Sequence, residues 1–343
     1  MARVPLSVLD LAPVVMGSTA REALANSTDL VRRAEALGYT RYWVAEHHNM
    51  PGIASSQPAV LLAHLGNHSS TIRLGSGGVM LPNHSPLVVA EQFGMLEALH
   101  PGRIDLGIGR APGTDQVTAA ALRRGDPARA AEEFPQSFRQ LMAYFDGEHP
   151  QIRAVPAKGY KPQIWMLGSS DFGAQVAALL GLPFSFAHHF AAANTEPALH
   201  IYKEHFTPSD EFLSESYASI GVSVVCAETE ERARYLAKPG ELSFIRLRTG
   251  KPARFASPEE AAEYQFSPLE RELLRGRESS VVIGDPVSVV AQLDDLVART
   301  GVQELIVTTT LYDHDDRVRS YELLAQEWGL SEAAGVKPQN DAV

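Results

Sequence analysis

Cysteine is almost absent from this chain of 343 residues, because Cys226 is the only one. A single cysteine excludes an internal disulfide framework and a zinc site built from cysteines. Its place in an apolar stretch predicts an inert buried thiol. No apolar run reaches the roughly 18 residues of a membrane-spanning helix, and Asp10 interrupts the apolar start that a signal peptide would need. We therefore expect a cytoplasmic protein with no membrane partner.

Positive charge is also scarce. The chain has 30 basic and 41 acidic residues, a net charge of −11. Nucleic acids and anionic membranes reward an excess of Lys and Arg, so neither is an expected partner. Hydrophobic residues make up 45% and charged residues 21%, which is enough for a large core. The length suggests two domains at about 100–200 residues each, but (β/α)₈ barrels commonly exceed about 250 residues as one unit.

Short apolar segments alternate with segments of helical pattern along the chain. Strands are expected at residues 4–9, 42–45, 72–74, 103–108, 164–167, 183–187, 218–227 and 304–309. Helices are expected at 19–37, 57–66, 86–99, 127–145, 171–180, 194–205, 228–238, 286–300 and 314–328. Alternating β and α units indicate a parallel sheet covered by helices. Eight units favour a closed (β/α)₈ TIM barrel over an open doubly wound sheet.

One long segment, residues 239–282, interrupts this rhythm before the last strand. An insertion of this length in a compact domain is usually a lid, a binding loop or a small subdomain. Its residues Arg254, Phe255, Tyr264 and Phe266 are candidates to line or cover a pocket, although local packing of the insertion is the preferred interpretation. We expect one barrel domain over residues 1–330 and a flexible polar tail at 331–343.

Reacting groups in such barrels lie where strands end, and the segment after the fifth expected strand has the clearest physical meaning. Gly168-Ser169-Ser170 joins that strand to a helix. Free backbone N–H groups and the helix dipole favour an anion there. Arg110, after the fourth strand, is a neighbour in barrel order and has a fork of donors for the same phosphate. The alternative is that Ser169 or Ser170 simply caps the helix.

The second expected strand ends in Glu46-His47-His48. This triplet indicates either acid–base chemistry or metal binding. Adjacent side chains on a strand point to opposite faces, so His47 and His48 cannot both face a pocket unless the backbone turns. The His-x-His spacing of a strand-built metal site is absent, and no metal is expected. A structural role for each histidine is equally open, as it is for His188 and His189.

A run of glycines, Gly75-Ser76-Gly77-Gly78, follows the third expected strand. It lacks the lysine of a P-loop and the spacing of a dinucleotide fingerprint. It is either a flexible strand end or a strained stretch of backbone against which a flat ligand rests.

Several segments together resemble the bacterial luciferase-like, flavin-dependent monooxygenases, in particular the branch related to the luciferase alpha chain. The resemblance covers about residues 3–329. It is carried by 42–48, 75–82, 100–103, 107–110, 168–170 and 181–183, in order and at strand ends. It implies a TIM barrel that binds reduced FMN at the carboxyl ends of the strands.

The resemblance also implies a role for each residue of this sequence that matches a functional position of the family. The resemblance implies that Arg110, Ser169 and Ser170 hold the FMN phosphate, with Leu167 and Gly168 in the same cofactor-binding segment. Gly77 and Gly78 match a non-proline cis peptide beside the flavin ring. Glu46 matches a flavin-proximal acid and His47 the catalytic histidine. Gly109 stands where luciferase has a pocket cysteine, and this departure puts light emission and the aldehyde substrate in doubt.

The function implied is a monooxygenase in which reduced FMN and O₂ form a flavin C4a-peroxide that oxidises a small organic substrate. A separate flavin reductase is expected as a partner, because no dinucleotide fingerprint provides for NADH. A homodimer through residues 57–65 and 86–99 is also implied. The alternatives are an F420-dependent hydride transferase on the same barrel, a non-catalytic flavin-binding protein and a metal-dependent hydrolase.

Overall fold

The computed structural model describes residues 3–111, 113–123 and 132–330. The expected tail at 331–343, and part of the helix expected at 127–145, lie outside the described residues. Within them the predicted (β/α)₈ barrel is confirmed. Its ring consists of β1 (Leu6–Asp10), β2 (Arg41–Val44), β3 (Arg73–Met80), β4 (Ile104–Gly109), β5 (Gln163–Gly168), β6 (Phe184–Phe186), β7 (Ala218–Cys226) and β9 (Glu304–Thr308). All neighbours pair in parallel, and the pairings β6–β7 and β1–β9 close the ring.

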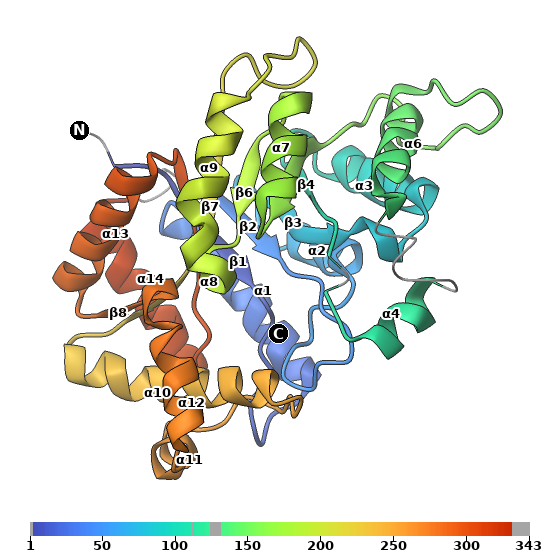
Figure 1. Ribbon diagram of the computed structural model, residues 1–343. Coiled ribbons are helices and arrows are strands. Elements are labelled where there is room, and N and C mark those ends of the chain that lie inside the picture. The colour runs from blue at the N-terminus through green and yellow to red at the C-terminus, as the bar shows by residue number, and fades with distance from the viewer. Residues whose placement is uncertain (1–2, 112, 124–131, 331–343) are drawn as a thin grey trace.

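Helices surround this ring in Figure 1. They are α1 (Ala20–Ala36), α2 (Pro58–Gly66), α3 (Pro86–Leu99), α4 (Gln116–Arg123), α6 (Phe134–Asp146), α7 (Asp171–Leu180), α9 (Thr195–Glu204), α10 (Glu230–Arg248), α13 (Pro286–Thr300) and α14 (His314–Trp328). Several of these helices begin at residues that favour a helix start. Thr19 and Glu22 form a reciprocal capping box at α1, and α2, α3 and α13 have a proline in their first turn.

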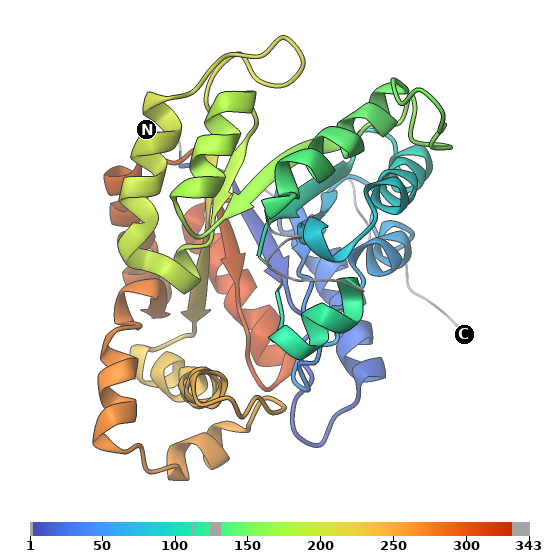
Figure 2. The same cartoon turned by 45° about the vertical axis from the view of Figure 1, so that its right-hand side comes forward.

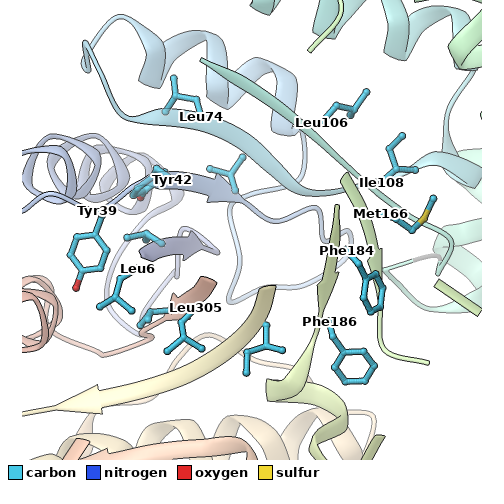
Figure 3. Close-up of a cluster of buried hydrophobic side chains, with 14 of the residues drawn as sticks. Leu6, Tyr39, Tyr42, Leu74, Leu106, Ile108, Met166, Phe184, Phe186 and Leu305 are labelled. Carbon is cyan, nitrogen blue, oxygen red and sulfur yellow. The ribbon is translucent and has the colours of Figure 1, made fainter. Parts of the chain in front are cut away.

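The main core lies between the strands and these helices. Strand residues alternate, so one set, such as Leu6, Tyr42, Leu106 and Phe184, is fully buried against the helices (Figure 3). The other set fills the barrel interior, where Leu9, Trp43, Ala45, Trp165 and Ile306 form a second apolar cluster. The interior is therefore packed at the level of this cluster.

At the amino-terminal end of the barrel the interior is ionic. Arg41 on β2 donates to Asp105 on β4 at 2.7 Å and to Glu304 on β9 at 2.7 Å and 3.0 Å. Arg73 on β3 also pairs with Asp105, and Tyr217 donates to Glu304 at 2.9 Å. Asp105 and Glu304 are fully buried. This network ties strands from opposite parts of the chain into one ring.

The glycine run, which was expected to follow the third strand, belongs to that strand. Gly75, Gly77 and Gly78 belong to β3, which runs on to Met80 with an irregular register between Gly77 and Val79. A Cβ on Gly75 would lie 2.6 Å from Trp43 Nε1, and one on Gly78 would lie 2.4 Å from Leu167 Cδ1. The strand continues here because glycine leaves room for side chains of the neighbouring strands.

The helix expected to end at residue 238 instead passes through Pro239 and ends at Arg248. Proline inside a helix removes one hydrogen bond at a cost of about 3 kcal/mol. Pro239 is buried together with Leu236 and Leu242, and their packing offsets that loss. The remaining insertion forms α11 (Pro258–Glu263), α12 (Pro268–Arg275), η3 (Glu278–Ser280) and β8 (Val281–Gly284).

Strand β8 was not predicted. It pairs only with β7 and lies outside the ring. Figure 2 shows α10 to α12, in yellow and orange, on the side toward which the strand arrowheads point. The insertion therefore covers the end of the barrel where the carboxyl ends of the strands meet.

Candidate active site

A cavity of about 1440 Å³ opens at the carboxyl ends of the strands. Its wall includes most of the residues singled out in the sequence, namely Glu46, His47, Gly77, Arg110, Leu167, Gly168, Ser169 and Ser170. Gly78 is not in the wall and packs behind it, against Leu167 and the backbone of Gly107. The insertion supplies the other side of the cavity. Barrel closure thus brings together motifs that are up to 124 positions apart, from Glu46 to Ser170.

The amino terminus of α7 forms part of this wall. Ser170 is the N-cap residue, but its hydroxyl makes no capping hydrogen bond, and Ser169 and Ser170 are both exposed. The alternative that either serine merely caps the helix is therefore not what the structure contains. Gly168 and Gly173 approach closely, since a Cβ on Gly173 would lie 3.2 Å from the Gly168 Cα. The backbone N–H groups of the first turn remain open to an anion.

Arg110 completes this corner of the cavity. Its guanidinium lies over the ring of Phe172, in the first turn of α7, at 3.9 Å from the ring centroid. Stacking occupies the face of the guanidinium and leaves its N–H edges, which make no hydrogen bond to any described residue. A cation, two hydroxyls and a helix amino terminus thus converge, as binding of a phosphate group requires.

Gly77 lies in the wall nearest the packed interior. The peptide between Gly77 and Gly78 is cis, as the resemblance implied. A Cβ on Gly77 would lie 2.7 Å from Leu9 Cδ1 and 3.2 Å from Trp43 Cε3. Since Leu9, Trp43 and Leu167 also line the cavity, this part of the wall is apolar.

The Glu46 carboxylate is buried and engaged on both oxygens. Oε1 lies 2.9 Å from Nε2 of His48 and 2.9 Å from Nε2 of His84, and the Met80 N–H donates to Oε2 at 3.0 Å. Burial works to raise the pKa of Glu46, but the hydrogen bonds from His48 and His84 outweigh it and lower the pKa to about 2. Glu46 is therefore an anion that joins the ends of β2 and β3, with no proton to give at neutral pH.

His47 faces the same cavity in a different state. Its Nδ1 lies 3.2 Å from the carbonyl oxygen of Gly113, so Nδ1 holds the proton and Nε2 is the basic nitrogen. Burial lowers the pKa of His47, while the bond to Gly113 opposes that change. A neutral imidazole that lines a cavity is able to accept a proton from a reacting group.

His189, which the sequence left open between functional and structural roles, also lines the cavity. Its Nδ1 donates to the Gly221 carbonyl at 2.8 Å. Burial, joined by the charges of His188, His47 and Arg277, lowers the pKa of His189 to about 4 against the effect of the Gly221 bond. Its neighbour His188 points instead to Thr195 and the Ser279 carbonyl. The His189 ring lies against Gly221 on β7, since a Cβ there would lie 2.8 Å from His189 Cε1. A larger residue at position 221 would therefore displace the ring.

Met80 occupies the space beside Gly109, the position of the luciferase pocket cysteine. A Cβ on Gly109 would lie 2.9 Å from the Met80 sulfur. The Met80 thioether thus reaches across from β3 to the position on β4 where the resemblance implied a cysteine in luciferase.

The insertion residues proposed for the pocket separate into two groups. Phe255 is buried and lines the cavity. Tyr264 packs on Phe266 at a ring distance of 5.0 Å and donates to Glu270, and Arg254 donates to the Ser18 carbonyl. Local packing therefore accounts for all but Phe255.

Cys226 is buried, and burial raises the pKa of its thiol to about 12.

Residues 4–304 match the family model of the luciferase-like monooxygenases. The chain belongs to this family. It is 45% identical over 325 residues to a luciferase-like monooxygenase of Escherichia coli strain K12, which covers 93% of this chain and 96% of the relative. It is 33% identical over 328 residues to the N-acetyl-S-alkylcysteine monooxygenase of Bacillus subtilis, with 93% and 97% covered.

Solved structures of luciferase-like proteins agree with the barrel. Apo-MsnO8 has a TM-score of 0.89 at 36% identity, covering 96% of this chain and 100% of that one. The oxygenating constituent of 3,6-diketocamphane monooxygenase from Pseudomonas putida was solved with FMN, and an F420-dependent secondary alcohol dehydrogenase with an F420–acetone adduct. Their identities of 18% and 11%, at TM-scores of 0.68 and 0.72, show a shared fold. By its family this chain is an oxidoreductase of the luciferase-like monooxygenases.

In the part of the chain that the structure describes, no three His, Cys, Asp or Glu side chains are grouped to hold a metal ion. Across residues 3–111, 113–123 and 132–330, every helix is too short or too polar to span a bilayer.

Proposed function

We propose that this chain uses reduced FMN and O₂ to transfer one oxygen atom to a small organic substrate. The observation that supports it best is the corner formed by Arg110, Ser169, Ser170 and the uncapped start of α7, which fits a phosphate dianion. The apolar wall at Gly77, Leu9 and Trp43 fits a flat ring system. Both parts of FMN thus have a complementary surface in one cavity.

When bound, reduced FMN supplies the electrons that activate O₂. The chain contributes position, exclusion of water and proton transfer. The insertion covers the cavity and limits water access. His47, neutral and with Nε2 as its basic nitrogen, takes or returns the proton at the reacting group. Glu46 keeps its charge and positions His48, His84 and the ends of two strands.

FMN is distinguished from F420, the alternative cofactor, by direct titration. We expect FMN to bind at least about 10-fold more tightly than F420, measured by quenching of flavin or deazaflavin fluorescence. The converse preference would favour a hydride transferase on the same site.

The phosphate corner is tested by comparing FMN with riboflavin, which lacks the phosphate. Arg110→Gln removes the charge but keeps the length of the side chain, and we expect FMN affinity to fall about 10- to 100-fold, as for loss of charge-assisted hydrogen bonds. Riboflavin affinity should be unchanged. Arg139→Gln, on the exposed face of α6, is the matched control. Equal losses for both ligands would contradict the proposed phosphate contact.

A separate reductase is part of the proposal. The purified chain with FMN should consume NADH slowly, and an added flavin reductase should start oxidation of the substrate. Rapid NADH oxidation with FMN alone would contradict this division of labour. The name of the Bacillus subtilis relative makes N-acetyl-S-alkylcysteines the first substrates to test.

We also propose a homodimer through α2 and α3. Apolar side chains on these helices remain exposed, namely Val60 at 69%, Leu99 at 61% and Met95 at 53%. Met95→Asp should shift the protein from dimer to monomer in size-exclusion chromatography with light scattering. Val117→Asp on α4, where Val117 is also exposed, is the control. A wild-type chain that is monomeric at tens of micromolar would rule the dimer out.

A further inference from the structure

Arginines other than Arg110 also line the cavity, namely Arg234, Arg248 and Arg277. Arg277 lies between α12 and η3 and is half-buried in the wall that the insertion supplies. Its backbone is fixed, because its N–H donates to the Leu274 carbonyl at 2.9 Å and its carbonyl accepts from the N–H and the hydroxyl of Ser280. The point from which the Arg277 side chain extends is therefore fixed in the cavity wall.

One face of α10 supports this guanidinium. Gly240, Phe244 and Arg248 recur every four residues and so share a face of the helix, and all three line the cavity. The Arg277 guanidinium lies 5.3 Å from the Phe244 ring centroid, and a Cβ on Gly240 would lie 3.7 Å from its Nη2. The absent side chain at Gly240 thus leaves the space that Arg277 fills.

Arg277 makes no side-chain hydrogen bond and no ion pair within 4.0 Å with any described residue. Glu241, in the same wall, acts on it only through space. Burial lowers the pKa of Arg277 and raises that of Glu241, since each loses hydration without gaining a contact partner. A partly desolvated guanidinium without a partner is costly unless a ligand supplies the counter-charge.

Arg277 also acts on a histidine of the cavity. It belongs to the insertion, and its charge is among those that act on His189, which follows β6. The phosphate corner is built from the ends of β4 and β5. Arg110 thus reaches the cavity from the end of a ring strand, and Arg277 reaches it from the insertion.

We infer that Arg277 binds a carboxylate of the organic substrate and orients that substrate in the cavity. The planar fork of a guanidinium matches the two oxygens of a carboxylate. Stacking on Phe244 keeps the fork rigid and its edge turned to the ligand. This inference rests on the proposed function, because it takes the phosphate corner to be used by FMN.

The test compares an acid with its ester in one protein. N-acetyl-S-benzylcysteine and its methyl ester differ only in the charged group, and their binding to the FMN-loaded full chain is measured by calorimetry. We expect the acid to bind about 10- to 100-fold more tightly than the ester. Arg277→Gln should abolish this preference and leave ester affinity within about twofold of wild type. Arg277→Lys should retain part of the preference, because it keeps the charge and loses the fork.

The control is Arg275→Gln, two residues earlier, which removes an exposed arginine paired with Glu272. It should leave the preference for the acid intact. Equal affinity of wild type for acid and ester, no binding of either at millimolar concentration, or an equal loss of both in Arg277→Gln would overturn the inference. A loss of FMN binding in Arg277→Gln with the acid preference kept would assign Arg277 to the cofactor and overturn it too.

Failure of the proposed function has a separate signature. If the wild-type chain does not bind FMN, that function is wrong, whereas the comparison of acid and ester repeated without FMN still decides the role of Arg277.

Discussion

At the scale of single residues, the triplet Glu46-His47-His48 shows how neighbours in sequence acquire different states. His48 and His84 both form hydrogen bonds with Glu46, and these bonds keep the Glu46 carboxylate ionised. His47 lies in the cavity wall and is held neutral by burial. The distinction follows from the hydrogen-bond partners, because Glu46 bonds to His48 and to groups after β3, whereas His47 bonds to the Gly113 carbonyl after β4.

His47 yields a prediction about pH. Because the pKa of His47 is lowered from 6.5, its neutral form is present at neutral pH and is lost only as the pH falls through that lowered value. Substrate oxidation should therefore rise with pH along a limb whose midpoint lies below 6.5. In His47→Gln that limb should vanish and kcat should fall about 100-fold or more. The measurement is kcat against pH with reduced FMN supplied by a reductase.

Two controls separate chemistry from binding. FMN affinity of His47→Gln should remain near wild type, and His68→Gln on the far side of the barrel wall should keep the full profile. If kcat of His47→Gln still rose with pH as in wild type, another group would have to take the proton, and His189 would be the first to examine.

At the scale of elements, the contact between β5 and α7 determines the phosphate corner. Gly168 ends the strand and Gly173 lies in the first turn of the helix, and the lack of side chains at both brings the two backbones together. The amino terminus of a helix binds an anion in this cavity only if its first turn lies at a suitable distance from the end of the strand. The glycine pair sets that distance.

Gly173→Ala tests this contact. The new Cβ would lie 3.2 Å from Gly168 Cα and from the Leu167 carbonyl, both of them backbone atoms. The helix must shift by a few tenths of an ångström, so we expect a loss of about 1–2 kcal/mol in unfolding free energy and several-fold weaker FMN binding. Gly276→Ala, at the end of α12, meets ordinary contact distances and is the control. Undiminished FMN affinity in Gly173→Ala would mean that the distance of α7 from the strand end is not critical.

At the scale of the whole molecule, the ionic network at the amino-terminal end of the barrel links the first and last parts of the chain. Arg41 connects Asp105 and Glu304, which are 199 positions apart. Buried ion pairs are costly to assemble but far more costly to break, because the remaining partner stays buried without counter-charge.

Arg41→Leu should therefore reduce the free energy of unfolding by about 3–5 kcal/mol, as for loss of one partner of a buried pair. Thermal melting followed by circular dichroism measures the effect. Arg299→Leu removes an exposed arginine that pairs with Glu196 and Asp295, and it should cost less than about 1 kcal/mol. Equal effects of the two substitutions would contradict the role assigned to the network.

The sequence predicted the order of strands and helices well because that order depends on local periodicity. It ended the helix before Pro239 and the strand before Gly75 too early, and it missed β8, whereas the cis peptide at Gly77-Gly78 that the resemblance implied is present. Where the structure differs, packing against distant residues outweighed the local preference. For the site, the motifs at strand ends were visible in sequence and the closed ring brings them into one cavity. His189 with Gly221, Met80 beside Gly109, and Arg277 on Phe244 had no local signature.

The sequence by itself thus determined an eight-unit barrel, because hydrophobic period is read within a few residues, and its strand-end motifs gave the resemblance to the luciferase-like family. Only the tertiary structure decided which histidines face the cavity, that the Glu46 carboxylate stays ionised, and that Arg110 and Arg277 lack a hydrogen-bond partner among the described residues. Burial, hydrogen bonding and charge pairing depend on residues that meet only when the ring closes, and these contacts determine the protonation and charge with which each group meets a ligand.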